Sequence, residues 1–195
     1  MPPRVVMLIA GAVSSLFLLT SVVIAGETID SLLRAGMPFV CAPFGAAVSA
    51  SEGKFSTVNQ YGCVGAFQFC PATLANYYDK SAGEFLAHPG DQVTAWLHYQ
   101  RDQWKIAVNN HLNSLLGRIV CHGMLGNIKR CSVIHDSAII MACQFGCGKL
   151  GKLANYLKGQ DCEAREVKDG NLVSVCDYLL RGAGYDVSCF TGGSC

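Results

Sequence analysis

Charged residues are scarce in this 195-residue chain: Asp, Glu, Lys and Arg make up 15% of it, and the formal net charge at pH 7 is +1. Soluble proteins average about 25% charged residues. The near-neutral balance lacks the basic excess that follows nucleic-acid phosphates, so no nucleic-acid partner is expected. The hydrophobic fraction of 51% excludes an intrinsically disordered chain.

The chain also lacks internal repeats, low-complexity linkers and a clear alternation of polar and apolar residues. We therefore expect no β-strands. Apolar residues instead recur at helical spacing, most clearly from Val93 to Leu115. A length of 195 residues is typical of one domain. The predicted fold class is mainly α, in a single domain.

No charge lies between Arg4 and Glu27, and Val5–Ala25 is an uncharged apolar run. The run is longer than the roughly 7–15 apolar residues of a usual export signal. It reaches the roughly 20 residues that span a bilayer. Residues 1–25 are therefore a signal peptide cleaved before Gly26 or an uncleaved membrane anchor. Both alternatives place residues 26–195 outside the cytoplasm, because the positive charge stays on the inner side.

Cysteine, in contrast, is abundant: all eleven cysteines follow Gly26. In an oxidising compartment they predict several disulfides, and their odd number leaves at least one without a partner in the same chain. The pairing cannot be derived from the sequence. A zinc site is the alternative, but the four candidate ligands do not follow a familiar zinc-binding spacing, and we expect no metal and no cofactor. Those four residues are Cys121, His122, Cys131 and His135.

Local signals place the helices. Thr28 is a suitable cap for a helix that ends near Gly36, and Pro71 is a suitable first helical residue. The turn His88–Asp91 precedes the longest helix, which Gly117 is expected to close. Further helices are predicted over residues 42–52, 132–144, 149–157 and 172–181.

Glu52 differs from the other four glutamates because it ends an apolar, small-residue helix and precedes a glycine-rich turn. A carboxyl group against apolar walls loses solvation of its charged form, which raises its pKa. Such a group can donate a proton at neutral pH. The alternative is a solvated residue at a helix end, without a chemical role.

The segment SEGKFSTVNQYGCVGAFQFCPATLANYY, residues 51–78, resembles the core motif of lytic transglycosylases and related lysozyme-like muramidases. In that family a glutamate closes a helix and an aromatic residue follows. An asparagine then leads into a Gly-x-x-Gly-x-x-Gln turn before a helix that starts with proline. The matching positions are Glu52, Phe55, Asn59, Gly62, Gly65, Gln68 and Pro71. Residues 139–157 and 171–187 resemble later helices of small exported members.

The resemblance implies a lysozyme-like lytic transglycosylase domain over residues 26–195, in the bacterial periplasm. Its activity would be cleavage of the MurNAc–GlcNAc β-1,4 bond of peptidoglycan with one catalytic residue, Glu52, and 1,6-anhydro products. The implied partners are peptidoglycan strands and an envelope-spanning secretion, conjugation or pilus machine. The implied substrate-binding residues are Ser51, Phe55, Asn59, Tyr61, Gly65, Phe67, Gln68, Gln144 and Tyr156.

Three positions depart from the family pattern. Gly53 replaces the serine that often follows the glutamate, although Ser51 or Ser56 could substitute for it. Cys143 and Gln144 stand where Tyr or His and then Asn or Leu are common. The alternative hypothesis is therefore a catalytically degenerate, lysozyme-like component that binds glycan or has a structural role in an envelope assembly.

Two competing motifs fall within residues 146–151. Gly146–Gly151 matches G-x-G-x-x-G, but no strand precedes it and no acidic residue follows at the dinucleotide-binding position. Cys147 could be a thiol nucleophile, but no local signature of a cysteine peptidase surrounds it. Disulfide formation is the preferred interpretation of this cysteine.

Overall fold

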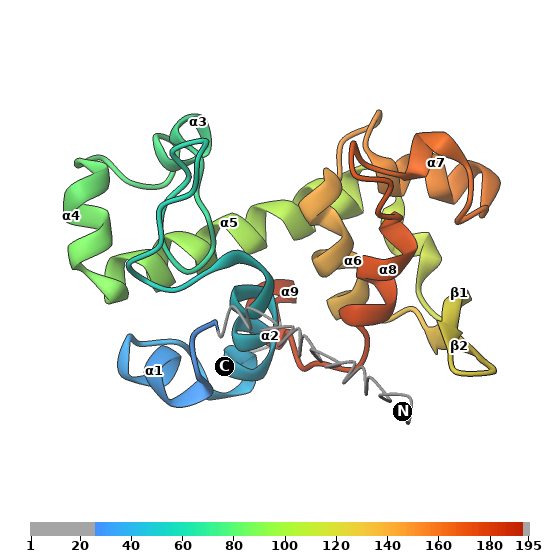
Figure 1. Ribbon diagram of the computed structural model, residues 1–195, viewed down its shortest axis with the longest axis horizontal. Coiled ribbons are helices and arrows are strands. Elements are labelled where there is room, and N and C mark those ends of the chain that lie inside the picture. Colours follow the sequence, from blue (N-terminus) through green and yellow to red (C-terminus); the bar gives the residue numbers. More distant parts are fainter. Residues whose placement is uncertain (1–25, 193–195) are drawn as a thin grey trace, which may run out of the picture.

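The longest element is helix α5, Pro89–Asn109, which runs through the middle of the molecule between two groups of elements (Figure 1). The computed structural model describes residues 26–192. The predicted signal or anchor, Val5–Ala25, lies outside these residues. Within them, no helix combines the length and the hydrophobicity needed to cross a membrane.

The chain builds one group before α5 and the other after it, and then returns to the first. The first group consists of α1 (Ile29–Arg34), η1 (Phe39–Cys41), α2 (Ala42–Glu52), α3 (Pro71–Leu74) and α4 (Ala82–Ala87), joined at the end of the chain by α9 (Ser188–Thr191). The second group consists of η2 (Leu112–Leu115), β1 (Ile119–Leu125), β2 (Ile128–Val133), α6 (Asp136–Ala142), η3 (Cys143–Phe145), α7 (Lys152–Gly159), η4 (Arg165–Val167) and α8 (Val175–Arg181).

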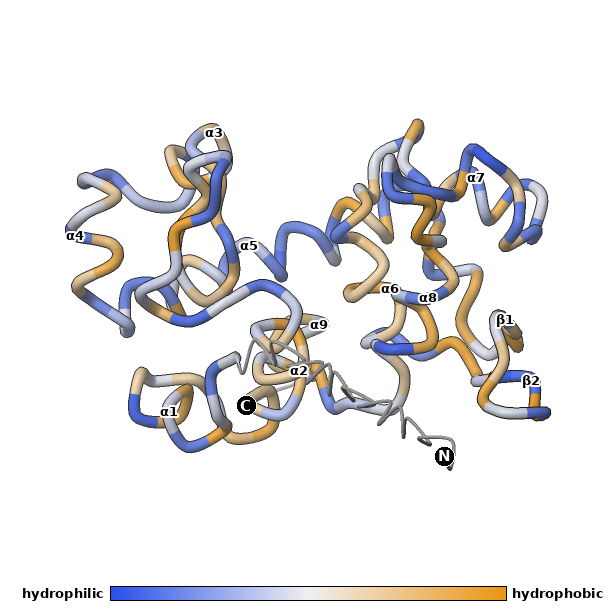
Figure 2. Tube along the Cα trace, in the orientation of Figure 1, coloured by the Kyte–Doolittle hydropathy of each residue, from blue (hydrophilic) through white to orange (hydrophobic). Residues whose placement is uncertain are grey.

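Each group has its own hydrophobic core. Phe44, Phe85 and Trp96 are buried in the first, and Ile139 and Leu179 in the second. Figure 2 shows α2 as largely hydrophobic, in keeping with its place in the first core. Each large apolar side chain removed from water contributes roughly 1.5–3 kcal/mol. Because α5 supplies residues to both cores, it is the wall that the two groups share.

Several local predictions are confirmed. Thr28 caps α1, and its Oγ1 accepts a hydrogen bond of 3.1 Å from the backbone N–H of Ser31. Helix α2 spans Ala42–Glu52 as predicted, and α3 begins at Pro71. The predicted turn His88–Asp91, however, is wrong, because α5 already begins at Pro89, a position where no backbone N–H is needed. The protein is mainly helical and rich in disulfides, as expected.

The prediction of a chain without strands is wrong. Strands β1 and β2 form an antiparallel hairpin in which Ile119 pairs with Val133 and Cys121 with Cys131. Apolar side chains lie on both faces of this hairpin, so the sequence does not alternate between polar and apolar residues. The two residues between the strands, Gly126-Asn127, were the available hairpin signal.

The boundaries of several helices also differ from the predictions. Helix α7 begins at Lys152 rather than at residue 149, and α8 begins at Val175 rather than at residue 172. Helix α5 ends at Asn109 rather than near Gly117, because His111 adopts a left-handed conformation with φ of 59°. Helix α6 begins at Asp136 rather than at residue 132, which belongs to β2. A non-glycine residue in the left-handed region stops a helix, and the sequence carries no glycine or proline there to announce it.

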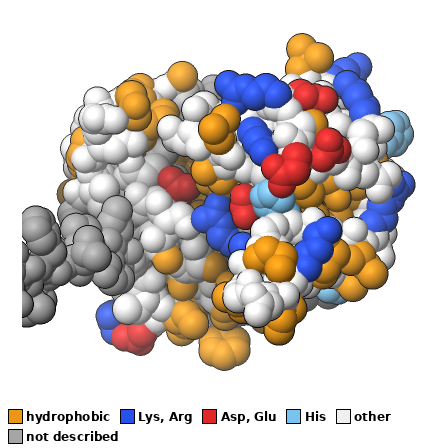
Figure 3. Space-filling view, turned by 45° about the vertical axis from the view of Figure 1, so that its right-hand side comes forward, with side chains coloured by type: hydrophobic (Ala, Val, Ile, Leu, Met, Phe, Trp, Pro, Cys, Tyr) orange, Lys and Arg blue, Asp and Glu red, His pale blue; other side chains and the backbone are white. Residues whose placement is uncertain are grey.

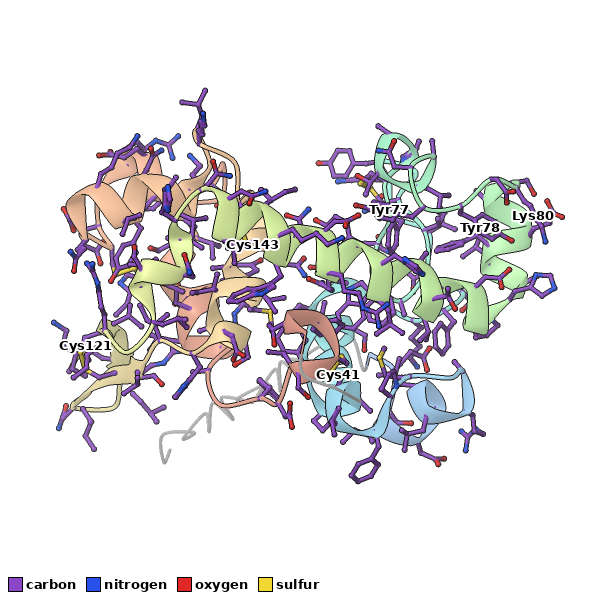
Figure 4. The ribbon with its side chains drawn as sticks, turned by 180° about the vertical axis from the view of Figure 1, so that it is seen from behind. Cys41, Tyr77, Tyr78, Lys80, Cys121 and Cys143 are labelled. Atoms are coloured by element: carbon purple, nitrogen blue, oxygen red, sulfur yellow. A yellow bond between two sulfur atoms is a disulfide. The ribbon has the colours of Figure 1, made fainter. Side chains whose placement is uncertain are left out.

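Ten cysteines form five disulfides, and the eleventh, Cys195, lies outside the described residues. The Cys121–Cys131 bond contradicts the zinc alternative, because these two sulfurs bind each other. Figure 4 shows Cys41, Cys121 and Cys143 in three separate parts of the molecule. The pairs are Cys41–Cys189, Cys63–Cys70, Cys121–Cys131, Cys143–Cys147 and Cys162–Cys176.

Candidate active site

Glu52 is the last residue of α2 and lies on its core-facing side. Phe44 and Val48 precede it at intervals of four residues, and both are buried in the first core. Side chains at this spacing share one helix face. The hydrophobic pattern of α2 therefore directs the carboxyl group of Glu52 toward the interior, where it is only partly accessible to water.

The carboxyl group of Glu52 lines a pocket of about 210 Å³. Residues 67–70, helix α3 and helix α5 provide three sides of this pocket, and η3 of the second group reaches it with Gln144. The pocket thus forms where the two groups meet. Its lining residues are Glu52, Phe67, Gln68, Phe69, Cys70, Thr73, Trp96, Tyr99 and Gln144.

Burial sets the protonation of this pocket. Desolvation raises the pKa of Glu52 above its ordinary value, and the guanidinium group of Arg181 opposes this rise. Desolvation also raises the pKa of Tyr99, and the negative charge of Glu52 adds to that rise. Tyr99 is therefore a neutral phenol at neutral pH, and Glu52 retains its proton at higher pH than an exposed glutamate.

The turn that carries Gln68 is held by several local contacts. Val64 and Phe69 exchange two backbone hydrogen bonds of 2.9 Å, and a disulfide joins the flanking Cys63 and Cys70. Gln68 adopts a left-handed conformation with φ of 50°, and its Nε2 donates a 2.8 Å hydrogen bond to the carbonyl of Gly65. These contacts fix the side of the pocket that Gln68 forms.

Gly65 and Asn59, two residues of the family-like motif, build this turn and do not line the pocket. Asn59 Oδ1 accepts hydrogen bonds of 2.8 Å from the N–H of Tyr61 and 3.0 Å from that of Cys63. Gly65 has φ of 82°, and a Cβ there would lie 2.2 Å from Gln92 Oε1. Only glycine allows such a close approach in this conformation. Both residues therefore have a structural role.

A second disulfide supports Gln144. The Cys143–Cys147 bond encloses Gln144, and Asn110 Nδ2 donates a 3.0 Å hydrogen bond to the carbonyl of Cys147. Because Asn110 directly follows α5, this contact connects the loop after η3 to the central helix. Gln144 faces the pocket from a restrained segment.

Four of the predicted site residues line the pocket: Glu52, Phe67, Gln68 and Gln144. The remaining side chains lie elsewhere. Ser51 is exposed, Tyr61 is 76% exposed, and Tyr156 is buried in the second core. Phe55 packs against the first core, and its N–H donates a 2.9 Å hydrogen bond to Glu27 Oε1. The geometry therefore does not confirm that the side chains of these four residues bind substrate in this pocket.

Three aromatic side chains of the pocket were not predicted from the sequence: Phe69, Trp96 and Tyr99. Trp96 stacks on Phe67 with a ring-centroid distance of 4.3 Å. Trp96 and Tyr99 are three residues apart on α5 and so share a face of that helix. That spacing, together with the aromatic residues of the turn, was the signal that could have identified them.

Three aspartates that follow the motif in the sequence lie outside this pocket. Asp79 and Asp102 line a larger surface hollow, of about 480 Å³, where Asp102 Oδ2 is 3.3 Å from the hydroxyl of Tyr77. Asp91 Oδ2 accepts a 3.1 Å hydrogen bond from Tyr78. Among the residues that the structure describes, Glu52 is the only carboxylate that lines its pocket.

Comparisons of the chain with protein-family models, with curated proteins and with solved structures find no match. The chemical interpretation of the pocket therefore depends on its geometry and on the motif of residues 51–78.

Proposed function

We propose that this protein is a peptidoglycan lytic transglycosylase in which Glu52 is the catalytic acid and base. The observation that carries the proposal is a partly buried carboxyl group with a raised pKa, which is the only carboxylate of its pocket among the described residues. A raised pKa favours the protonated form that a general acid needs at neutral pH.

The single carboxylate is the feature that favours a transglycosylase over a hydrolase. Glycosidases that hydrolyse their substrate use two carboxyl groups, one as acid and one as nucleophile or base. A transglycosylase that forms 1,6-anhydro sugars needs one, because the nucleophile is the 6-hydroxyl of the muramoyl residue itself. The resemblance of residues 51–78 to the lytic transglycosylase motif supports the same choice.

The proposed reaction returns Glu52 to its starting state. The protonated Glu52 gives its proton to the glycosidic oxygen as the bond from that oxygen to C1 of the muramoyl residue breaks. The muramoyl 6-hydroxyl oxygen then forms a bond to C1, and its proton passes to the Glu52 carboxylate. The products are a 1,6-anhydro-muramoyl end and a free GlcNAc 4-hydroxyl, and no water is consumed.

Polar and aromatic groups of the pocket support a sugar as substrate. The amides of Gln68 and Gln144 can each donate and accept hydrogen bonds to hydroxyl or N-acetyl groups. Tyr99, as a neutral phenol, can do the same near Glu52. The rings of Phe67, Phe69 and Trp96 provide apolar surface, although Phe67 and Trp96 also belong to the first core.

The cellular setting that we propose is the bacterial envelope, outside the cytoplasm. Five disulfides are suited to an oxidising compartment, and the apolar run Val5–Ala25 is suited to export or anchoring. Local cleavage of peptidoglycan strands there would make room for an envelope-spanning secretion, conjugation or pilus machine.

The second candidate is a protein that binds glycan without cleaving it. Two observations favour it: Gly53 replaces the serine that often follows the catalytic glutamate, and Cys143 is bonded to Cys147 and so offers no polar group to the substrate. In this alternative the pocket holds a sugar, and the disulfides serve only to keep its walls in place.

Digestion of purified peptidoglycan, followed by mass analysis of the products, tests the two candidates. We expect anhydro-muropeptides from the unaltered protein and none from Glu52→Gln. Glu166→Gln is the matched control, because Glu166 is exposed and lies in a different hollow. Equal activity of the Glu52→Gln variant would remove Glu52 from the mechanism. Glycan binding without products would favour the second candidate.

A further inference from the structure

The hairpin of β1 and β2 presents large apolar side chains to solvent. Leu125 is 74% exposed, Ile128 73%, Ile119 68% and Met124 60%. The solvent-facing side of a small antiparallel sheet is ordinarily polar. A contiguous apolar patch on a protein surface marks an interaction site.

The register of the strands places Ile119 and Met124 on one face, and it places the pair Leu125 and Ile128 on the opposite face, at the end of the hairpin next to the turn. Val133, Cys131 and Lys129 alternate along β2, so their side chains lie on the same face. Their partners on β1 are Ile119, Cys121 and Met124, which extend that face. The Cys121–Cys131 disulfide therefore lies in the middle of an apolar surface, and Leu125 and Ile128 form the tip of the hairpin.

Polar groups of the hairpin contact the body of the protein. His122 Nδ1 is 3.2 Å from Glu163 Oε1, and its Nε2 is 3.4 Å from Asp177 Oδ2. Arg130 Nη1 lies 3.7 Å from Asp177 Oδ1. The hairpin is thus held with polar groups inward and much of its apolar surface outward. This is the reverse of the arrangement that solvent exposure favours.

Within the hairpin and the segment that leads to it, the charged side chains are all basic. No acidic residue occurs between Asp102 and Asp136, whereas Arg118 and Lys129 are exposed. Figure 3, which brings this side of the molecule forward, shows hydrophobic side chains in its lower part with basic side chains among them. Apolar side chains beside cations match the boundary between the acyl chains and the headgroups of an anionic membrane.

The shape of the surface agrees with this occupant. The hairpin extends from the second group at one edge of the molecule, so its tip is convex and suits insertion into a planar layer (Figure 1). The sequence independently predicts that the protein is exported across a membrane or anchored in one, because Val5–Ala25 is an uncharged apolar run.

We propose that the outer face and the tip of the hairpin dock on an anionic phospholipid bilayer. Leu125 and Ile128 would enter the acyl boundary, and Lys129 would contact the lipid phosphates. The residues involved do not line the Glu52 pocket, so this proposal does not depend on the proposed enzymatic activity.

A tryptophan introduced by Leu125→Trp reports on this contact in the full chain. The control is Leu150→Trp, because Leu150 is 89% exposed in the loop between η3 and α7. Each variant is incorporated into phosphatidylglycerol vesicles with brominated acyl chains, and the emission of Trp96 and Trp104, measured in the unaltered chain, is subtracted. We expect about a twofold or greater quenching at position 125 and little at position 150.

Two changes should weaken the quenching at position 125. Ile128→Ser removes an apolar contact, and Lys129→Gln or zwitterionic phosphatidylcholine removes the electrostatic attraction. Equal quenching at positions 125 and 150 would mean that the N-terminal run alone holds the chain at the bilayer, and would overturn the proposal. No quenching, with emission that changes with protein concentration, would instead indicate association of two copies through the hairpin and would overturn it as well.

Discussion

Arg181 Nη1 lies 3.5 Å from Ser51 Oγ and donates a hydrogen bond to it, so α8 of the second group contacts the last turn of α2. The guanidinium carbon of Arg181 also lies 4.0 Å from the ring centroid of Tyr178. That ring packs edge-on against Phe145, at 4.2 Å between centroids. These contacts form a series that joins Phe145, which follows Gln144, to Ser51, which precedes Glu52. The environment of the carboxyl group depends on both groups of elements.

Replacing the charge of Arg181 should change the titration of Glu52. In Arg181→Met the positive charge that lowers the pKa of Glu52 is lost, so we expect that pKa to rise further. Carboxyl-carbon NMR across a pH series measures it without any substrate. Arg181→Lys is the control and should keep the Glu52 pKa closer to that of the unaltered protein. A Glu52 pKa that does not move in Arg181→Met would refute the electrostatic link.

The stability of the protein should depend on the protonation of Glu52. Burial raises the pKa of Glu52 in the folded state above its ordinary value of 4.5, so the folded state holds this proton more tightly than the unfolded state. The associated stabilisation is complete below the unfolded pKa and is lost as the pH rises through the folded pKa. Relative to Glu52→Gln, the unaltered protein should therefore lose stability as the pH rises above the ordinary pKa of 4.5 and through the raised pKa of the folded state.

Thermal unfolding at pH 4 and pH 7 tests this dependence. We expect the Tm of Glu52→Gln to exceed that of the unaltered protein at pH 7, with a smaller difference at pH 4. The exposed Glu166→Gln serves as control and should follow the unaltered protein at both pH values. A constant difference between the Tm values at the two pH values would show that Glu52 is not desolvated.

Substitution of the two buried glutamines of α5 should change the free energy of unfolding by very different amounts. Gln92 Oε1 accepts a 3.0 Å hydrogen bond from the N–H of Ala66, and its Nε2 donates to the carbonyls of Phe55 and Phe85 at 2.9 and 3.0 Å. Gln92→Leu leaves these three backbone groups without their partner, which should cost about 2–5 kcal/mol.

Gln100 is also buried, but its side-chain amide makes no hydrogen bond to any described residue. Gln100→Leu should therefore be nearly neutral, within about 1 kcal/mol, or stabilising. Urea unfolding of both variants gives the comparison. Similar losses in the two variants would mean that burial of the amide, and not its hydrogen bonds, decides the cost.

The disulfides should differ in their contributions according to the loops they close. Cys41–Cys189 has a sequence separation of 148, and Cys143–Cys147 has one of 4. In the chain-entropy model these loops correspond to about 5 and about 2 kcal/mol. Unfolding of the two double Cys→Ala variants under oxidising conditions measures both. A larger loss for Cys143→Ala/Cys147→Ala would contradict the entropic account.

Local sequence signals predicted the parts of the fold that depend on neighbouring residues. Thr28 and Pro71 mark helix starts by their own chemistry, and the apolar spacing of Phe44 and Val48 turns Glu52 inward. Gln68 was predicted through its place in a motif, and it lines the pocket. In these cases the physical cause lies within a few residues of its effect.

Contacts between distant segments explain what could not be predicted. Tyr61 and Tyr156 are both aromatic, yet one is exposed and the other buried, because packing from other elements decides their surroundings. Trp96 and Tyr99 enter the pocket only because α5 passes beneath the turn of residues 64–70. The hairpin of β1 and β2 carries no alternating pattern, since one of its apolar faces is exposed.

The Cys41–Cys189 disulfide has a consequence for the resistance of the protein to peptidases. It closes the chain into a covalent ring that includes every residue lining the Glu52 pocket. A single peptidase cut in any loop between the two cysteines leaves both fragments linked. The walls of the pocket then cannot diffuse apart, and a nicked molecule can retain its structure.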